Sequence, residues 1–126
     1  NEAQARGIDY KIGMESMKSV PSIMCNPTEI REIFVNIIKN ALDAMPDGGD
    51  ISFGTWSGND TIFVSITDNG EGMSEDVKKN IFDPFFTTKG VDGAGLGMSM
   101  AYGIVARHGG KIEVSSVIGK GTTFTM

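Results

Sequence analysis

The spacing of hydrophobic residues changes along the chain, and each spacing predicts a different element. Residues 8–14 alternate between apolar and polar side chains, which is the pattern of a half-buried β-strand. From residue 30 the apolar side chains recur every three or four positions, which predicts an amphipathic α-helix. Asn26 can cap this helix, Pro27 suits its first position, and the Pro-Asp-Gly-Gly run at 46–49 ends it. The apolar face of the helix comprises Ile30, Ile33, Phe34, Ile37, Ile38, Ala41, Leu42 and Met45.

The remainder of the chain continues to switch between the two patterns. Further strands are expected from residue 51 and over 62–68, 112–117 and 122–126, and further helices from Ser74 to about Ile81 and over 98–108. Turns at 58–60 and 119–121 join neighbouring strands. Residues 82–97 form a long connection rich in Gly and Thr, and a connection of this length in a small domain is usually functional. This order of elements predicts one two-layer α/β domain.

Charge and composition narrow the classes of function. The 126 residues carry a net charge of −5 and show no cluster of Lys or Arg, which argues against a nucleic-acid surface. No apolar run approaches the ~20 residues of a membrane-spanning helix, and no signal peptide is visible. The single Cys25 rules out an internal disulfide, suits a reducing compartment and is expected to pack among its apolar neighbours. An anionic ligand would therefore be held by local groups and not by the overall charge.

A polar stripe follows one edge of the long helix. At ~100° per residue, Glu32, Asn36, Asn40 and Asp43 fall on one line beside the apolar face. Asparagine is a mediocre helix former, so two of them four positions apart need a reason. Either they are exposed or capping amides, or their oxygens coordinate a hard cation such as Mg²⁺.

Asp68 ends the strand over 62–68 on the same side as its apolar residues. A carboxylate on a buried face is costly without a partner. One interpretation is a plain Asp-Asn-Gly turn; the other is a buried acceptor for the exocyclic amine of adenine. The glycines of the following run, Asn69-Gly70-Glu71-Gly72-Met73, allow close backbone approaches.

A glycine cluster, Gly93-Ala94-Gly95-Leu96-Gly97, directly precedes a predicted helix. Backbone N–H groups at such a helix start can hold an anion without net positive charge. The chain lacks the Gly-x-x-x-x-Gly-Lys-Ser/Thr pattern of a P-loop. By itself this cluster is weak support for a phosphate site.

In combination these features resemble the catalytic domain of sensor histidine kinases. The order is an asparagine helix, an Asp-x-Gly-x-Gly strand end, the Phe-Asp-Pro-Phe-Phe box at 82–86, and then Gly-x-Gly-Leu-Gly. The resemblance covers about residues 8–126, within the superfamily of gyrase B and the mismatch-repair ATPases, and Thr87-Thr88-Lys89 is similar to nitrogen-regulatory and sporulation-type kinases. It implies a Bergerat-type α/β sandwich, with a mixed sheet of about five strands, three helices on one face, and ATP between the helices and a lid.

The resemblance also implies roles for individual residues. Asn40 would ligand Mg²⁺, Asn36 would lie close to the phosphates, and Asp43 would contribute through water or a lysine. Asp68 would accept a hydrogen bond from the adenine amine. Thr122, on the same strand face as Phe124, would assist it, with Thr123 as the alternative if that register is wrong. The expected ATP contacts beyond these are Gly70, Gly72, Met73, Lys89, Gly93, Gly95, Leu96 and Gly97.

Residues 82–97 would form the ATP lid, with Phe82, Phe85 and Phe86 as its hydrophobic anchors. Lys89 would reach the terminal phosphates or else remain a solvated lysine. Relatives that hydrolyse ATP carry a water-activating glutamate at the position of Asn36, and an amide is not a usable base. Efficient hydrolysis is therefore not expected. Glu32 resembles the acid proposed to orient or deprotonate the acceptor imidazole.

The expected reaction is transfer of the γ-phosphate of MgATP to a histidine, followed by relay to a response regulator receiver domain. The only histidine, His108, ends the last predicted helix and resembles a structural feature. The acceptor is therefore expected on an upstream dimerisation domain that is absent here, with residues 1–6 as the tail of the linking helix and 7–126 as the catalytic domain. Both chain ends resemble cuts through a longer polypeptide. The parent is expected to be a cytoplasmic or membrane-anchored homodimer with this part in the cytoplasm, and the fragment a monomer.

Three alternatives remain at this point. The first is a serine kinase of the anti-sigma class on the same fold, against which the phenylalanine box and the Thr-Thr-Lys run argue. The second is an ATPase or nucleotide-switch module, against which the amide at position 36 argues. The third is a non-catalytic pseudokinase module, which the intact set of motifs disfavours.

Overall fold

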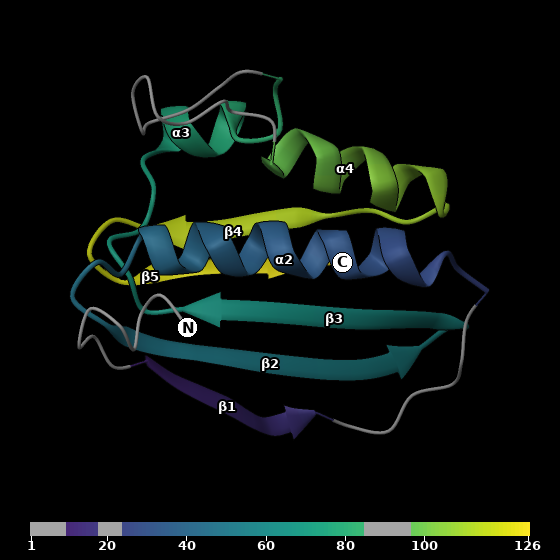
Figure 1. The fold of residues 1–126 in the computed structure, drawn as a ribbon, viewed down its shortest axis with the longest axis horizontal. Coiled ribbons are helices and arrows are strands. Elements are labelled where there is room, and N and C mark those ends of the chain that lie inside the picture. Colours follow the sequence, from purple (N-terminus) through teal and green to yellow (C-terminus); the bar gives the residue numbers. More distant parts are fainter. Residues whose placement is uncertain (1–9, 18–23, 85–96) are drawn as a thin grey trace.

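A mixed β-sheet forms one layer of the molecule (Figure 1). The computed structural model describes residues 10–17, 24–84 and 97–126. Within these ranges the sheet has five strands in the order β1-β2-β3-β5-β4, with β1 parallel to β2 and the other neighbours antiparallel. The predicted mixed sheet is thus confirmed. The strands are β1 (Tyr10–Met17), β2 (Gly49–Gly58), β3 (Thr61–Asp68), β4 (Glu113–Val117) and β5 (Gly121–Thr125).

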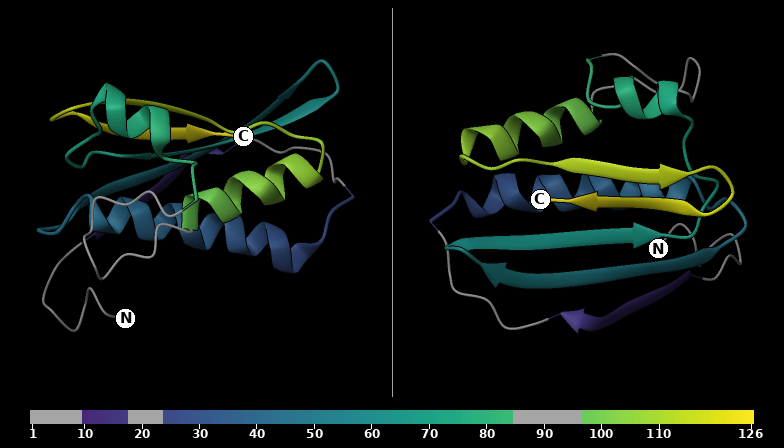
Figure 2. Two further views of the ribbon diagram at one scale, coloured as in Figure 1. Left: turned by 90° about the horizontal axis from the view of Figure 1, so that it is seen from above. Right: turned by 180° about the vertical axis from the view of Figure 1, so that it is seen from behind.

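The described helices are α2 (Pro27–Asp43), α3 (Glu75–Asn80) and α4 (Gly97–Arg107). α2 and α4 lie side by side over one face of the sheet, as the left view of Figure 2 shows. α3 lies instead beside the edge strand β4 (Figure 1), where Lys78 Nζ donates to the carbonyl oxygen of Ser116 at 3.1 Å. The expectation of three helices on one face therefore needs refinement. The reason is that α3 has only six residues and none of them is buried, so it has no apolar face with which to cover a sheet.

The hydrophobic core lies between α2, α4 and the sheet. Ile33, Ile37 and Ala41 on α2 are buried at the predicted helical spacing. Phe124 on β5 is the largest fully buried side chain, at 1% exposure. The core consists of Ile33, Ile37, Ala41, Met45, Ile51, Ile66, Met98, Ala101, Ile104, Val105, Ile112 and Phe124.

The hairpin of β2 and β3 determines where Asp68 lies. Its turn residues Asn59 and Asp60 have φ values of 52° and 60°, a left-handed conformation that these two residue types tolerate. From this turn the register runs back until Ile51 lies opposite Asp68. A tight turn at one end thereby places the carboxylate at the other end of the hairpin, directly beside a core residue.

The N-terminus of α2 is joined to the C-terminus of α4. His108 Nδ1 donates to the carbonyl oxygen of Ile104 at 2.8 Å, and His108 Nε2 accepts the backbone N–H of Asn26 at 3.1 Å. Arg107 forms an ion pair with Glu29 beside this bond. The prediction that His108 has a structural role is confirmed by these contacts. The interpretation of neighbouring Cys25 as a packed side chain is wrong, because Cys25 is exposed where the chain approaches the helix.

We expect Asn26→Ala to lower the free energy of unfolding by about 1 kcal/mol, because its Oδ1 accepts the N–H groups of Thr28 and Glu29 at 3.0 and 3.2 Å. Urea unfolding followed by circular dichroism measures the change. The matched variant Asn26→Ser retains a capping oxygen, so its free energy of unfolding is expected to fall by only a fraction of this amount. Equal losses in the two variants would contradict a capping role.

Candidate functional site

Asp68 is a buried carboxylate at the end of β3, with only 4% of its surface exposed. Its Oδ1 accepts the backbone N–H of Gly70 at 2.9 Å. Burial raises the pKa of Asp68, because desolvation disfavours the charged form, while hydrogen bonds from the backbone of Gly70 and Thr122 lower it in part. The chain thus keeps an acceptor at a position where ionisation is costly. The prediction that this side chain points inward is confirmed.

Three polar side chains form a row across neighbouring strands. Ser116 on β4 lies opposite Thr122 on β5, and Thr122 lies opposite Asp68 on β3. All three are buried, and Ser116 Oγ lies 2.8 Å from Thr122 Oγ1. Thr123 points to the other face, where its hydroxyl lies 3.0 Å from that of Thr67. The register that turns Thr122 inward is therefore the correct one, and Thr123 is not needed as the alternative.

Ser116 is a site residue that the sequence reasoning missed. It follows Ile112 and Val114 at a period of two and therefore shares their inward face. That signal was present in the sequence. The hairpin of these two strands was also expected; what the structure adds is its register, which places Ser116 opposite Thr122.

The segment after Asp68 packs between α2 and the turn that joins β4 and β5. The N–H of Glu71 donates to the carbonyl oxygen of Ala44 at 3.0 Å, and the carbonyl oxygen of Glu71 accepts the N–H of Gly119 at 2.8 Å. Gly72 has a φ of +74°, and a Cβ there would lie 2.2 Å from the carbonyl oxygen of Val117. Gly72 is thus required by close backbone packing.

The backbone N–H groups of Gly70 and Met73 already have partners within the protein. Gly70 donates to Asp68 and Met73 donates to Ser116 Oγ at 2.8 Å, while the Met73 side chain packs on the core. A contact of either residue with ATP would therefore be made through other atoms. Their roles in binding ATP remain predictions.

The asparagine stripe of α2 meets the N-terminus of α4. Gly97 is the first residue of α4, and a Cβ on it would lie 3.3 Å from Asn36 Oδ1, so the missing side chain permits this approach. Asn36 Nδ2 is buried and has no hydrogen-bond partner among the described residues. An unpaired buried donor costs about 1–3 kcal/mol. The first turn of α4 carries no acidic residue, so no carboxylate in that turn competes with an anion for the positive end of the helix.

The other residues of the stripe differ in exposure. Asn40 is half-buried, whereas Glu32 and Asp43 are exposed. No group of three or more His, Cys, Asp or Glu side chains gathers for a metal within residues 10–17, 24–84 and 97–126. The amide oxygens of Asn36 and Asn40 remain candidate donors for Mg²⁺ on this stripe. Mg²⁺ fits such a set, because it commonly takes one or two protein ligands and completes its shell with phosphates and water.

The predicted lid lies mostly outside the described residues. Lys89, Gly93, Gly95 and Leu96 belong to that part, together with Phe85, Phe86 and the two threonines before Lys89. Phe82 is described, and its ring lies 5.3 Å from that of Tyr102 and 6.2 Å from that of Phe124. The prediction of a hydrophobic anchor is confirmed for Phe82.

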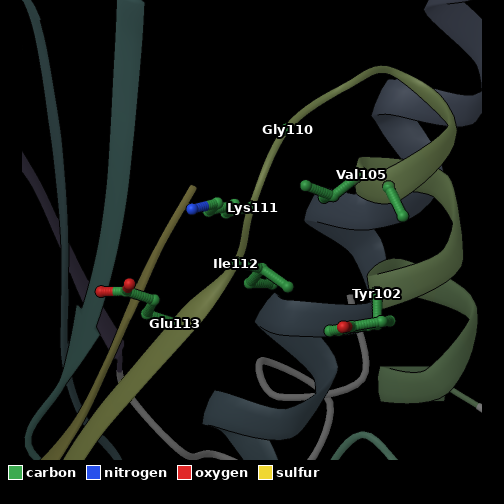
Figure 3. A pocket seen from close by; sticks show the side chains of 7 residues that line it. Tyr102, Val105, Gly110, Lys111, Ile112 and Glu113 are labelled. Carbon is green, nitrogen blue, oxygen red and sulfur yellow. The ribbon is translucent and has the colours of Figure 1, made fainter.

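A cavity of about 260 Å³ lies between α4 and residues 110–113 (Figure 3). Tyr102, Val105 and Ile112 line it, while the side chains of Lys111 and Glu113 point away from it. None of the predicted site residues lines this cavity.

Among the helices described here, none is long and apolar enough to cross a membrane.

Comparison with known proteins agrees with this arrangement. Residues 25–126 match the family described as histidine kinase-, DNA gyrase B-, and HSP90-like ATPase. The chain is 41% identical over 124 residues to sporulation kinase E of Bacillus subtilis (strain 168) and 38% identical over 122 residues to the sensor histidine kinase ZraS of Escherichia coli (strain K12). These alignments cover 97% of this chain but only 16% and 26% of the two relatives.

Solved structures give the same result. The catalytic domain of histidine kinase ThkA superposes with a TM-score of 0.79 at 28% identity, covering 98% of this chain and 80% of that one. Full-length ShkA in complex with AMPPNP gives a TM-score of 0.80 at 27% identity over 98% of this chain and 26% of that one. ThkA in complex with the response regulator TrrA gives 0.73 at 25% identity over 98% and 34%.

The buried carboxylate predicts a characteristic pH dependence. Because the pKa of Asp68 is raised in the folded domain, its ionisation lowers stability as the pH rises from about 3.9 through the raised pKa. Asp68→Asn lacks this ionisation. The free energy of unfolding of the variant, relative to the unmodified domain, should therefore increase with pH over this window and then level off.

Urea unfolding at a series of pH values measures this difference. Asp50→Asn makes the same chemical change at an exposed position and serves as the control for the substitution itself. A relative stability of Asp68→Asn that is constant with pH, or that falls as the pH rises, would contradict the raised pKa.

Proposed function

Because the chain belongs to the histidine kinase-, DNA gyrase B- and HSP90-like ATPase family and is an ATP-binding catalytic domain of the histidine kinase type, we propose that it transfers the γ-phosphate of MgATP to a histidine on a separate dimerisation domain. The observation that carries the proposal is the pairing of a buried acceptor with a buried donor. Asp68 is a buried acceptor held at the end of β3, and Asn36 on α2, beside the first residue of α4, is a buried donor with no partner among the described residues. The buried acceptor suits the adenine ring of ATP, and the buried donor suits a phosphate group.

Adenine is held by Asp68, whose ionised carboxylate accepts a hydrogen bond from the exocyclic amine. Gly70 orients the carboxylate through its N–H, and Thr122 lies directly across the β3–β5 pair. Gly70, Gly72 and Met73 shape the backbone that passes beside the base. Charge-assisted hydrogen bonds of this kind are stronger than neutral ones.

The phosphates lie along the polar stripe of α2 and at the N-terminus of α4. Asn36 would donate through Nδ2. The amides of Gly93, Gly95 and Gly97, with Leu96 and Lys89, would complete the anion site, and of these only Gly97 belongs to the described residues. Asn40 holds Mg²⁺ through its amide oxygen, and Asp43 contributes through water. Bound Mg²⁺ neutralises charge on the phosphates, and most of the catalysis then comes from positioning.

In the transfer step an imidazole nitrogen of the acceptor bonds to the γ-phosphorus, and the bond from this phosphorus to the oxygen bridging to the β-phosphate breaks. ADP leaves with that oxygen, and the imidazole loses a proton. Glu32 is exposed on α2, where it can orient or deprotonate an incoming imidazole. Asn36 supplies no base for water, so the nucleotide is kept for the histidine.

The partners are proposed on the same basis. The ThkA structure in complex with response regulator TrrA supports a receiver domain as the next phosphate acceptor, which would receive it on an aspartate. The chain spans about a sixth to a quarter of the length of the curated relatives, which supports a longer parent protein. We propose that the parent is a homodimer and carries the acceptor histidine on an upstream domain. Residues 1–6 would link to it, 7–126 would form the catalytic domain, and this part would act in the cytoplasm.

The proposal is tested by phosphoryl transfer. The protein that carries this domain together with its acceptor, incubated with Mg²⁺ and ATP labelled at the γ-phosphate, is expected to acquire acid-labile, alkali-stable label, as a phosphoramidate would. Asp68→Asn should weaken ATP binding by about tenfold to a hundredfold by calorimetry and reduce labelling in parallel. Steady release of inorganic phosphate without protein labelling would favour an ATPase instead.

Asn40→Ala is expected to bind ATP with an affinity that Mg²⁺ no longer increases, because the proposed metal ligand is lost. Titration of ATP with and without Mg²⁺ measures this. Lys39→Ala, at an exposed neighbouring position on α2, serves as the control and should keep its Mg²⁺ dependence. An equal gain from Mg²⁺ in both variants would refute the metal assignment.

A further inference from the structure

The hydroxyl of Ser116 is the centre of a buried hydrogen-bond network. Ser116 Oγ lies 2.8 Å from each of three partners: the backbone nitrogen of Met73, the carbonyl oxygen of Gly121 and the hydroxyl of Thr122. Ser116 and Thr122 are 6% and 4% exposed. Because solvent is largely excluded, each hydrogen in this network has few acceptors within reach.

Counting protons determines the direction of every bond. A serine hydroxyl has one hydrogen to donate and two lone pairs to accept with. The N–H of Met73 can only donate to Ser116 Oγ, and the carbonyl of Gly121 can only accept from it. The single Ser116 hydrogen is thus used on Gly121, so the Thr122 hydroxyl must donate to Ser116. Its own hydrogen is then occupied, and only its lone pairs remain available.

We propose that Ser116 is a positioning residue that turns the Thr122 hydroxyl into an acceptor only, and that it thereby sets the selectivity of the site for adenine over 6-oxopurine nucleotides. The inference rests on the proposed function, since it concerns the base that Asp68 receives. Asp68 lies directly opposite Thr122 and, when ionised, has no hydrogen to donate. The row therefore presents two acceptors to the ligand.

Two adjacent acceptors discriminate between purines at position 6. Adenine carries an amino group there, with hydrogens to donate, whereas hypoxanthine and guanine carry a carbonyl oxygen that cannot donate. An acceptor that faces another acceptor leaves both atoms without a hydrogen bond. Leaving buried polar atoms unpaired is a strong way for a polar site to reject a ligand. Without Ser116, the Thr122 hydroxyl would be free to rotate and donate to a carbonyl oxygen.

The same serine also connects the site to the turn between β4 and β5. Met73 lies at the end of the segment that follows Asp68, and Gly121 begins β5. A Cβ on Gly121 would lie 2.0 Å from the carbonyl oxygen of Asp68, so these two strands are in close contact at this point. Ser116 is therefore held on both sides, which keeps the direction of its hydrogen bonds constant.

The test compares the binding of ATP with that of inosine triphosphate, which replaces the amino group by a carbonyl oxygen. Calorimetry gives the ratio of the two dissociation constants for the unmodified chain and for Ser116→Ala. We expect the preference for ATP to fall several-fold, up to about tenfold, in the variant. Ser115→Ala alters the exposed neighbour on β4 and should keep the original ratio. A variant that loses affinity for both nucleotides equally would show a merely structural role and overturn the proposal.

A second variant keeps the test decisive if Ser116→Ala does not fold. Thr122→Val removes the acceptor but leaves the bonds of Ser116 to Met73 and Gly121 in place. It should weaken ATP binding and leave the binding of inosine triphosphate unchanged. Equal weakening of both would overturn the inferred direction of the hydrogen bond. Failure of the unmodified chain to bind ATP would instead refute the proposed function itself.

Discussion

The burial of one carboxylate constrains much of this structure. Asp68 lies on the core face of β3 beside Ile51, and desolvation opposes its charge. Hydrogen bonds from the backbone of Gly70 and of Thr122 on the partner strand β5 compensate for part of this cost. A stability-optimised sheet would place an apolar residue here. The retention of an acceptor at such a position is what connects the fold to the binding of a base.

The two ends of the α2–α4 helix pair differ in how fully their polar groups are paired. At one end the α2 cap and the α4 terminus are joined through His108 and Asn26, and through Arg107 and Glu29. At the other end α4 begins at Gly97 beside an amide nitrogen of Asn36 that has no partner among the described residues. The first end is held in place by hydrogen bonds and an ion pair, whereas the second end retains a donor that can bind an anion.

Much of the fold and part of the site could be predicted from local patterns. The apolar spacing of α2 predicted its buried face, Asn26 and Ser74 predicted two helix caps, and strand alternation predicted that Asp68 and Thr122 point inward. Ser116 carried the same alternation signal but no recognisable chemistry. The position of α3 at the sheet edge and the exposure of Cys25 were not predicted, because both depend on which surfaces remain uncovered after packing.

The sequence by itself determined the elements, their buried faces and the candidate residues, because hydrophobic periodicity and capping are properties of a few neighbouring positions. Only the tertiary structure decided that β5 also pairs with β3, so that Asp68 joins Ser116 and Thr122 in one row. It also brought Asn36 to the start of α4. The physical reason is that strand pairing and helix packing join residues far apart in the chain, and the directions of buried hydrogen bonds follow only once those neighbours are in place.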